Sequence, residues 1–166
     1  DSWPTMQGPG WQVGYQGRRY RVRAEPNTGS IWSYRNSSAK DVSIGVDMQV
    51  ASGEGGLLLR LLDAKSYLAV VIDPTEGSYR VEQRSGGQMA RLSSGTSTAI
   101  QAGADSVNRL VVRLSGASLQ LFVNGQQLAD VSAERPADTG RYGLLAVASS
   151  SAAEVFFDNL EIRALE

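Results

Sequence analysis

The chain has 166 residues and a mass of 17.8 kDa, a length that suits one domain, so we expect residues 1–166 to form a single domain. Its 16 basic and 17 acidic side chains nearly cancel, which argues against a nucleic-acid-binding protein, since such proteins gather a basic excess on one face. Histidine and cysteine are absent from the sequence, which excludes Ser-His-Asp and Cys-His catalysis, Cys/His zinc sites and thiol redox chemistry.

The sequence has neither a membrane-spanning segment nor a signal peptide pattern. No apolar run approaches the roughly 18 residues that a transmembrane helix needs, and the first residues lack a basic start followed by an apolar stretch. The chain begins at Asp1 rather than at methionine, so we expect either a processed chain or a part of a larger exported protein.

Alternation of apolar and polar residues with a period of two predicts strands throughout the chain. The clearest example is residues 41–50, whose apolar members share one face: Val42, Ile44, Val46, Met48 and Val50. In chain order, we expect strands at residues 12–16, 19–24, 31–34, 41–50, 56–62, 67–73, 78–84, 88–92, 98–101, 107–114, 119–123, 127–131, 141–148 and 155–163.

The segments between these strands have the composition of turns. Asn124-Gly125 stands between two apolar stretches and predicts a hairpin, because both turn positions need a positive φ. Polar stretches predict loops at residues 51–56, 93–97 and 133–140. Many short strands with frequent turns indicate an all-β sandwich or barrel, and we expect residues 42–50, 107–114 and 155–163 to be among its central strands.

Several segments, taken in order, resemble a known group of proteins. They are Gly14-Tyr15, Tyr20-Arg21-Val22, Ile31-Trp32-Ser33, Leu58-Leu59-Arg60, the run from Tyr67 to Ile72, Gly77-Ser78-Tyr79-Arg80, Asn108-Arg109-Leu110, the run from Leu121 to Gly125, Gly143-Leu144 and the run from Val155 to Leu160. This order resembles the concanavalin A-like lectin/glucanase superfamily. More narrowly, it is similar to bacterial extracytoplasmic domains of lipoproteins and of sensor kinases, and to 3-keto-disaccharide hydrolase-type domains.

The resemblance implies a jelly-roll sandwich of two antiparallel sheets, with ligands held on the concave side of one sheet. It also implies an extracytoplasmic location: secreted, periplasmic or on the cell surface. Glucanases of this superfamily use a Glu-x-Asp-x-x-Glu run as nucleophile and general acid, and the acidic cluster of Glu154, Asp158 and Glu161 does not reproduce that spacing. We therefore expect a protein without glucanase-type catalysis.

Aromatic residues supply the candidate binding site, since their flat faces stack on sugar rings. The candidates are Trp32, Tyr34, Tyr67 and Tyr79, with Arg60 as a hydrogen-bond donor. Arg60 interrupts an apolar run, so it must either lie on a wet concave face or pair with a carboxylate such as Asp47 or Asp73. The alternative is that the aromatic residues pack in the core and that Arg60 forms a structural ion pair.

Asp158 is the candidate metal ligand. In resemblance to other carbohydrate-binding jelly rolls, Asp158 and Asn159 stand where a structural calcium ion is often bound, and hard cations prefer clustered oxygen ligands. The alternative is that the Asp158 side chain bonds to nearby backbone.

Three functions remain open from the sequence. The first is a non-catalytic extracytoplasmic module that binds a saccharide or a cell-envelope glycan. The second is a protein-interaction or structural domain of a larger surface or sensor protein. The third is a glycoside-acting hydrolase, which would need two carboxylates about 5–9.5 Å apart in one cleft.

Overall fold

The computed structural model describes residues 3–133 and 140–165, apart from the side chains of residues 36–39. Its strands form two antiparallel sheets, of eight and six strands. In spatial order, the first sheet consists of β1 (Met6–Gly8), β2 (Trp11–Gln16), β3 (Arg19–Ala24), β14 (Ala153–Ala164), β5 (Val42–Ser52), β10 (Val107–Ser115), β11 (Ser118–Val123) and β12 (Gln126–Ser132). The second consists of β4 (Gly29–Ala39), β13 (Gly140–Ala148), β6 (Glu54–Asp63), β7 (Ser66–Asp73), β8 (Ser78–Ser85) and β9 (Gln88–Thr96).

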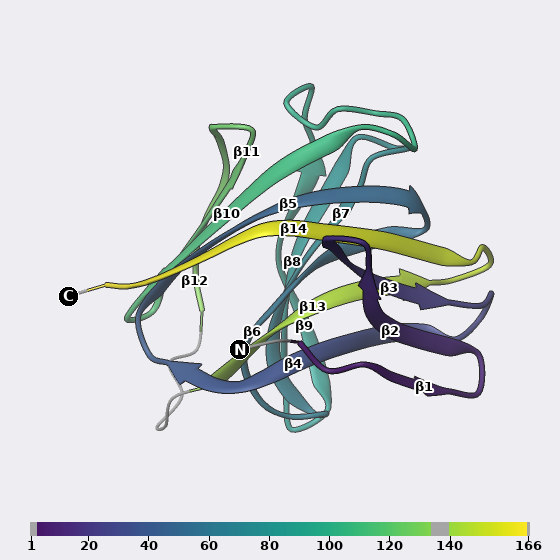
Figure 1. The fold of residues 1–166 in the computed structure, drawn as a ribbon. Coiled ribbons are helices and arrows are strands. Elements are labelled where there is room, and N and C mark those ends of the chain that lie inside the picture. The colour runs from purple at the N-terminus through teal and green to yellow at the C-terminus, as the bar shows by residue number, and fades with distance from the viewer. Residues whose placement is uncertain (1–2, 134–139, 166) are drawn as a thin grey trace.

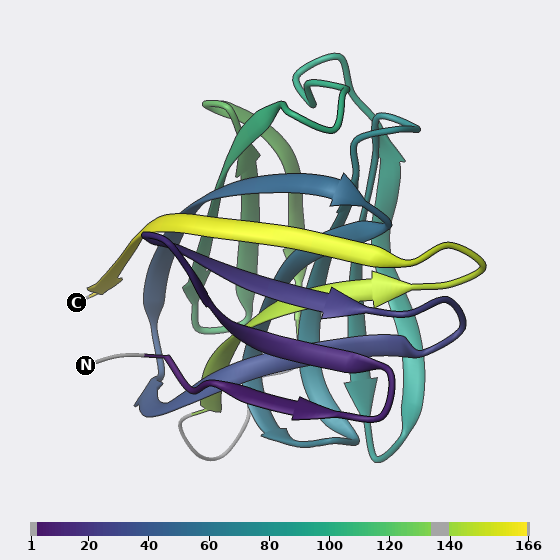
Figure 2. The same cartoon turned by 45° about the vertical axis from the view of Figure 1, so that its right-hand side comes forward.

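The two sheets pack face to face as a sandwich. Figure 1 shows β5 and β14 in the nearer layer, with β7 and β8 behind them. Figure 2 shows β14 between β5 and β3, which agrees with the order of the eight-stranded sheet. Because β14, β5 and β10 occupy the middle of that sheet, the prediction that these segments are central is confirmed. No helix able to span a bilayer occurs in the described residues.

The core lies between the sheets and follows from the alternation in the sequence. On β5, Val46 and Met48 face inward and are fully buried, while Asp47 between them lies on the opposite face. The six-stranded sheet contributes Leu57, Leu59 and equivalent residues of its other strands to the same core. Burial of these alternating apolar residues fixes the register of each strand, since a slip by one residue would expose the whole apolar set.

Three expectations about individual segments are wrong, and one strand was not expected. Residues 51–56 do not form a loop, because β5 runs to Ser52 and β6 begins at Glu54, with only Gly53 between them. Residues 93–97 are not a loop either, since β9 continues to Thr96. The three-residue edge strand β1 is too short to show alternation and was not expected. Of the loop expected at residues 133–140, residues 134–139 lie outside the described residues.

The third wrong expectation is the strand at residues 98–101, which is a turn instead, because two asparagine side chains bind its backbone. The Asn108 amide accepts a hydrogen bond from the Gln101 N–H at 2.8 Å and donates one to the Gln101 carbonyl at 3.1 Å. Asn124 donates to the Ala99 carbonyl at 2.8 Å and to Asn108 Oδ1 at 2.8 Å. These bonds replace the strand partners that the segment would otherwise need.

We expect Asn108→Ala to lower the free energy of unfolding by about 1–3 kcal/mol, because Asn108 is buried and its loss leaves the Gln101 backbone without partners. Urea denaturation measures this change. The control is Gln101→Ala, which removes an exposed side chain from the same contact and should change the free energy by less than about 0.5 kcal/mol. Equal effects of the two substitutions would contradict the assignment.

Candidate functional site

The six-stranded sheet buries apolar side chains on both faces. Leu57 and Leu59 of β6 point into the core between the sheets, whereas Leu58 points to the other side, here called the outer face. Leu58 is nevertheless only 1% exposed, in a second cluster whose other buried members are Leu61, Ala69, Val71 and Leu145. An apolar cluster on the outer face of a sheet must be covered by further side chains, and these define the candidate site.

Strand pairing arranges the outer face in rows that cross the sheet. One row runs through Trp32, Leu145, Gly56, Val71 and Arg80. The next row runs through Tyr34, Gly143, Leu58, Ala69, Glu82 and Arg91. Each row therefore has an aromatic residue at the β4 edge, small or aliphatic residues in the middle and charged residues toward β8 and β9.

The aromatic residues close over the apolar middle of the face. Trp32 and Tyr67 stand on strands three spacings apart, which is about 14 Å in a sheet. Their ring centroids are nevertheless only 5.7 Å apart, at an interplanar angle of 53°, and both rings pack on the second apolar cluster. The two side chains thus lean toward each other from opposite sides of the cluster and form an aromatic surface at its centre.

Arginine side chains stack beside the tyrosines of this face. The guanidinium carbon of Arg141 lies 5.1 Å from the centroid of the Tyr34 ring, and that of Arg84 lies 5.9 Å from the centroid of the Tyr67 ring. Both distances fall within the range of cation–π contacts. Tyr34 is 39% exposed, so part of its ring remains open to solvent.

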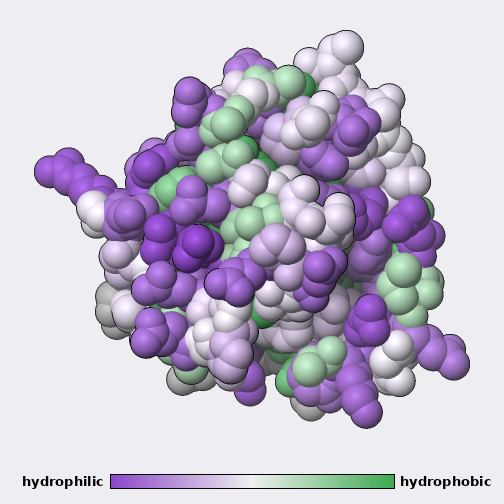
Figure 3. Space-filling model, turned by 90° about the vertical axis from the view of Figure 1, so that its right-hand side faces the viewer, coloured by the Kyte–Doolittle hydropathy of each residue, from purple (hydrophilic) through white to green (hydrophobic). Residues whose placement is uncertain are grey.

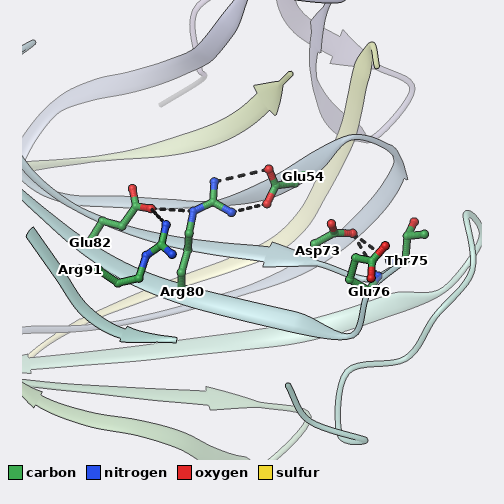
Figure 4. Close-up of polar contacts among 7 residues, drawn as sticks. All are labelled: Glu54, Asp73, Thr75, Glu76, Arg80, Glu82 and Arg91. Atoms are coloured by element: carbon green, nitrogen blue, oxygen red, sulfur yellow. Dashed lines mark hydrogen bonds and ion pairs between the residues drawn. The ribbon is translucent and has the colours of Figure 1, made fainter. Parts of the chain in front are cut away.

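A charged network on the outer face joins Glu54 at the start of β6 to residues of β8 and β9 (Figure 4). The Arg80 guanidinium donates to both carboxylate oxygens of Glu54, and its Nε lies 2.7 Å from Glu82 Oε1. Arg91 Nη2 reaches the same Glu82 oxygen at 3.3 Å. In Figure 4 the other oxygen of Glu82 points away from both arginines. The network therefore holds the Glu82 carboxylate in place and leaves one of its oxygens directed elsewhere.

The two glutamates also stabilise the charge of Arg80. Partial burial alone would lower the pKa of Arg80, but the hydrogen bonds and negative charges of Glu54 and Glu82 outweigh that effect and raise its pKa above the ordinary value.

The nearby Asp73 side chain stabilises a turn. Its Oδ1 accepts the backbone N–H groups of Thr75 and Glu76, at 3.0 Å and 3.3 Å, and closes the β7–β8 turn (Figure 4).

Three of the five residues predicted to contact a ligand lie together, and two do not. Trp32, Tyr34 and Tyr67 share the outer face of the six-stranded sheet. Tyr79 packs against the core between the sheets, and its hydroxyl donates to the Leu128 carbonyl at 3.0 Å. Arg60 is 5% exposed and lies inside the protein.

Arg60 makes the structural contacts that the sequence left as its alternative. It adopts a positive φ of 49° at an irregularity in β6, and its guanidinium donates to the Gly116 carbonyl and lies 3.9 Å from the Asp41 carboxylate. Asp41 is thus its carboxylate partner, rather than Asp47 or Asp73. Asp47 instead pairs with Arg109 at 3.3 Å.

Asp158 bonds to nearby backbone. Its Oδ1 accepts the Asn159 N–H at 2.8 Å, at a β-bulge where Asn159 has a φ of 52°. The neighbouring Asp47 carboxylate is bound by Arg109 and by the Asn159 side-chain amide, which lies 2.8 Å from Asp47 Oδ2. Among the described residues, no three acidic side chains gather where they could hold a metal ion. The geometry around Asp158 therefore does not fit a calcium site.

Sequence reasoning missed the charged half of the outer face. Glu54 was hidden in a stretch that reads as a loop, and Arg141 stood at the first position of an expected strand, where the sequence does not show what its side chain contacts. A signal was present for the others, because Arg80, Glu82 and Arg84 alternate with Tyr79, Val81 and Gln83 along one strand. That alternation places the three charges on one face and Tyr79 on the opposite one.

Comparisons with known proteins agree with this architecture. Residues 5–163 match the family of 3-keto-alpha-glucoside-1,2-lyase-like domains. No curated protein matches the sequence.

Solved structures that share the fold include the following three. The carbohydrate binding module CBM66 from Bacillus subtilis superposes with a TM-score of 0.79 at 16% identity, covering 98% of this chain and 95% of that one. The exoplasmic/lumenal domain of VIP36, in a form bound to Ca²⁺ and Man3GlcNAc, gives 0.72 at 16% identity over 99% and 84% of the two chains. A Bacillus subtilis protein of unknown function with a galectin-like fold gives 0.72 at 11% identity over 97% and 88%. The predicted concanavalin A-like jelly-roll sandwich is confirmed.

We expect calcium chloride and a chelator to leave the melting temperature unchanged, because Asp158 has a backbone partner and Arg109 supplies the positive charge beside Asp47. Differential scanning calorimetry with each additive measures this. A rise of the melting temperature with calcium that Asp158→Asn abolishes would show instead that Asp158 is a calcium ligand.

Proposed function

This chain belongs to the family of 3-keto-alpha-glucoside-1,2-lyase-like domains, and on that premise we propose that it binds a saccharide on the outer face of its six-stranded sheet. The observation that carries the proposal is the Trp32–Tyr67 pair, which closes over a buried apolar cluster on a face that no other sheet of the described chain covers. Partly exposed aromatic rings on such a cluster offer a flat apolar surface to a sugar ring.

The surrounding polar groups complete a saccharide site. A sugar stacked on Trp32 and Tyr67 presents its hydroxyl groups sideways, toward the rows that end in charged residues. Glu82 is two strands from the apolar centre at Leu58, and Ala69 between them is too small to block the approach. The carboxylate of Glu82 accepts hydrogen bonds from hydroxyl groups, and the arginines donate them.

The proposal extends to the role and the location of the protein. We place the domain outside the cytoplasm, as a non-catalytic module for a saccharide or a cell-envelope glycan. Support comes from the names of two structural neighbours, one a carbohydrate binding module and the other an exoplasmic/lumenal domain bound to Man3GlcNAc. A protein-interaction domain would instead present a large continuous apolar patch. On the face shown in Figure 3, hydrophobic residues form small groups among hydrophilic ones.

A second candidate function is lyase activity, which the family description favours. A 1,2-elimination from a 3-keto glucoside removes the proton at C2, which the ketone acidifies, forms a C1–C2 double bond and breaks the bond between C1 and its leaving oxygen, which takes up a proton. The reaction needs a base that can reach C2. Glu82 is the carboxylate of the outer face whose second oxygen points away from its arginine partners (Figure 4), so it is the residue that would act as this base.

We expect Trp32→Ala and Tyr67→Ala each to weaken saccharide binding by at least about 10-fold, because the loss of a stacked aromatic surface costs more than about 1.4 kcal/mol. A glycan array identifies the ligand, and isothermal titration calorimetry then measures the affinities. Tyr79→Phe is the control, since Tyr79 faces the core and should leave the affinity unchanged. Unchanged affinity in both aromatic variants would overturn the proposed site.

We expect no release of aglycone when the protein is incubated with a 3-keto glucoside, since both glutamates of the face are bound to arginine and serve in positioning. Chromatography of the reaction mixture measures the release. Turnover that Glu82→Gln abolishes while saccharide binding persists would establish the lyase in place of the binding module.

A further inference from the structure

The outer face of the six-stranded sheet carries arginines and glutamates in unequal numbers. Its arginines are Arg80, Arg84, Arg91 and Arg141, and its glutamates are Glu54 and Glu82. The two glutamates bind Arg80 and Arg91 and neutralise them. Within the described part of the chain, no carboxylate lies within 4 Å of the Arg84 or Arg141 guanidinium. Among the described residues, these two arginine charges therefore have no acidic partner.

These two arginines flank the aromatic surface. Arg141 pairs with Leu61 across β13 and β6, and Arg84 pairs with Tyr67 across β8 and β7. Tyr67 stands opposite the irregular segment 60–62 of β6, so Arg141, Leu61, Tyr67 and Arg84 form a third row across the sheet. The unbalanced charges thus lie on either side of a strip of apolar and aromatic surface.

Both guanidinium groups are held at rings rather than by carboxylates. Arg141 stacks beside Tyr34 and Arg84 beside Tyr67. Arg84 Nη1 donates to the Gly87 carbonyl at 3.3 Å, while its Nε is buried and has no hydrogen-bond partner. Arg84 as a whole is only partly buried, and its terminal nitrogens have a carbonyl rather than a carboxylate as their partner, so these nitrogens can still bind an anionic ligand.

We infer that the saccharide bound at this face is acidic, a sugar carrying a carboxylate, with Arg84 and Arg141 as the residues that select it. This inference rests on the proposed function. A neutral sugar that covered the third row would displace water from two arginine side chains without supplying a negative charge to them, which is unfavourable. A uronate supplies a planar carboxylate that a guanidinium binds through two parallel hydrogen bonds, while the ring of the sugar stacks on Trp32 and Tyr67.

The test compares an acidic sugar with the neutral methyl ester of the same sugar. Oligomers of galacturonate and of glucuronate are titrated into the protein by calorimetry, alongside the same oligomers with their carboxylates methyl-esterified. The ester keeps the ring and its stacking surface but removes the charge. We expect at least one acid to bind about 10-fold or more tightly than its ester, and we expect this preference to shrink as sodium chloride rises from 50 to 500 mM.

Variants identify the residues. Arg84→Gln and Arg141→Gln should each remove most of the preference for the acid, so that the affinity for the acid falls much more than the affinity for the ester. Arg23→Gln is the matched control: it removes the same charge from an exposed position on the eight-stranded sheet and should leave the preference intact. Thermal unfolding verifies that every variant is folded. Arg84→Lys keeps the positive charge but removes the planar guanidinium, so it tests whether charge alone retains part of the preference for the acid.

The possible outcomes distinguish a failure of the acidic-ligand inference from a failure of the proposed saccharide binding. Equal binding of acid and ester, or binding of neither while neutral glycans bind through Trp32, would overturn the acidic ligand and leave saccharide binding standing. A sulfated sugar preferred over both uronates would also overturn the carboxylate assignment. Absence of all saccharide binding would overturn the proposed function as well.

Discussion

Burial on both faces of β6 and β7 is the constraint on which the rest of this structure depends. Leu57 and Leu59 fill the core between the sheets, and Leu58 and Ala69 require cover on the other side. The eight-stranded sheet cannot provide that cover, so side chains of the same sheet provide it by leaning across one another. Trp32 and Tyr67 are therefore needed for stability as well as for the proposed stacking, and the two roles share one surface.

The strands that could be predicted best from the sequence are those with one face exposed to solvent. Alternation in residues 41–50 identified both β5 and its inward side, because Asp47 and its polar neighbours face away from the core. Glycine-rich composition misled the prediction at Gly55 and Gly56, which lie within β6. A Cβ on Gly56 would lie 1.7 Å from the Val70 carbonyl oxygen, so glycine is needed there for close approach of backbones and not for a turn.

The candidate site was predicted only in part, because its members are assembled by register. Tyr79 pairs with Ile72, a core residue, whereas Tyr67 pairs with Arg84 on the outer face. Alternation along β8 separates Tyr79 from the charges of its own strand, but the sequence does not contain the strand pairing, so it does not show that Tyr67 shares a face with those charges. Arg60 escaped prediction for a different reason: its positive φ at an irregularity of β6 turns its side chain toward Asp41 and Gly116, against simple alternation.

Gly53 alone joins β5 to β6, and these strands belong to different sheets. Its φ is 72°, and a Cβ there would lie 2.7 Å from that of Ala153. Hairpin tips such as the one at Gly86 and Gly87 can lengthen without altering the strands they join, since their added residues project into solvent. One residue inserted at Gly53 would shift β6 by one position and exchange its two faces. The hairpin tips can therefore vary in length and carry new surfaces, whereas the one-residue connection at Gly53 cannot lengthen without changing how the two sheets pack at this corner.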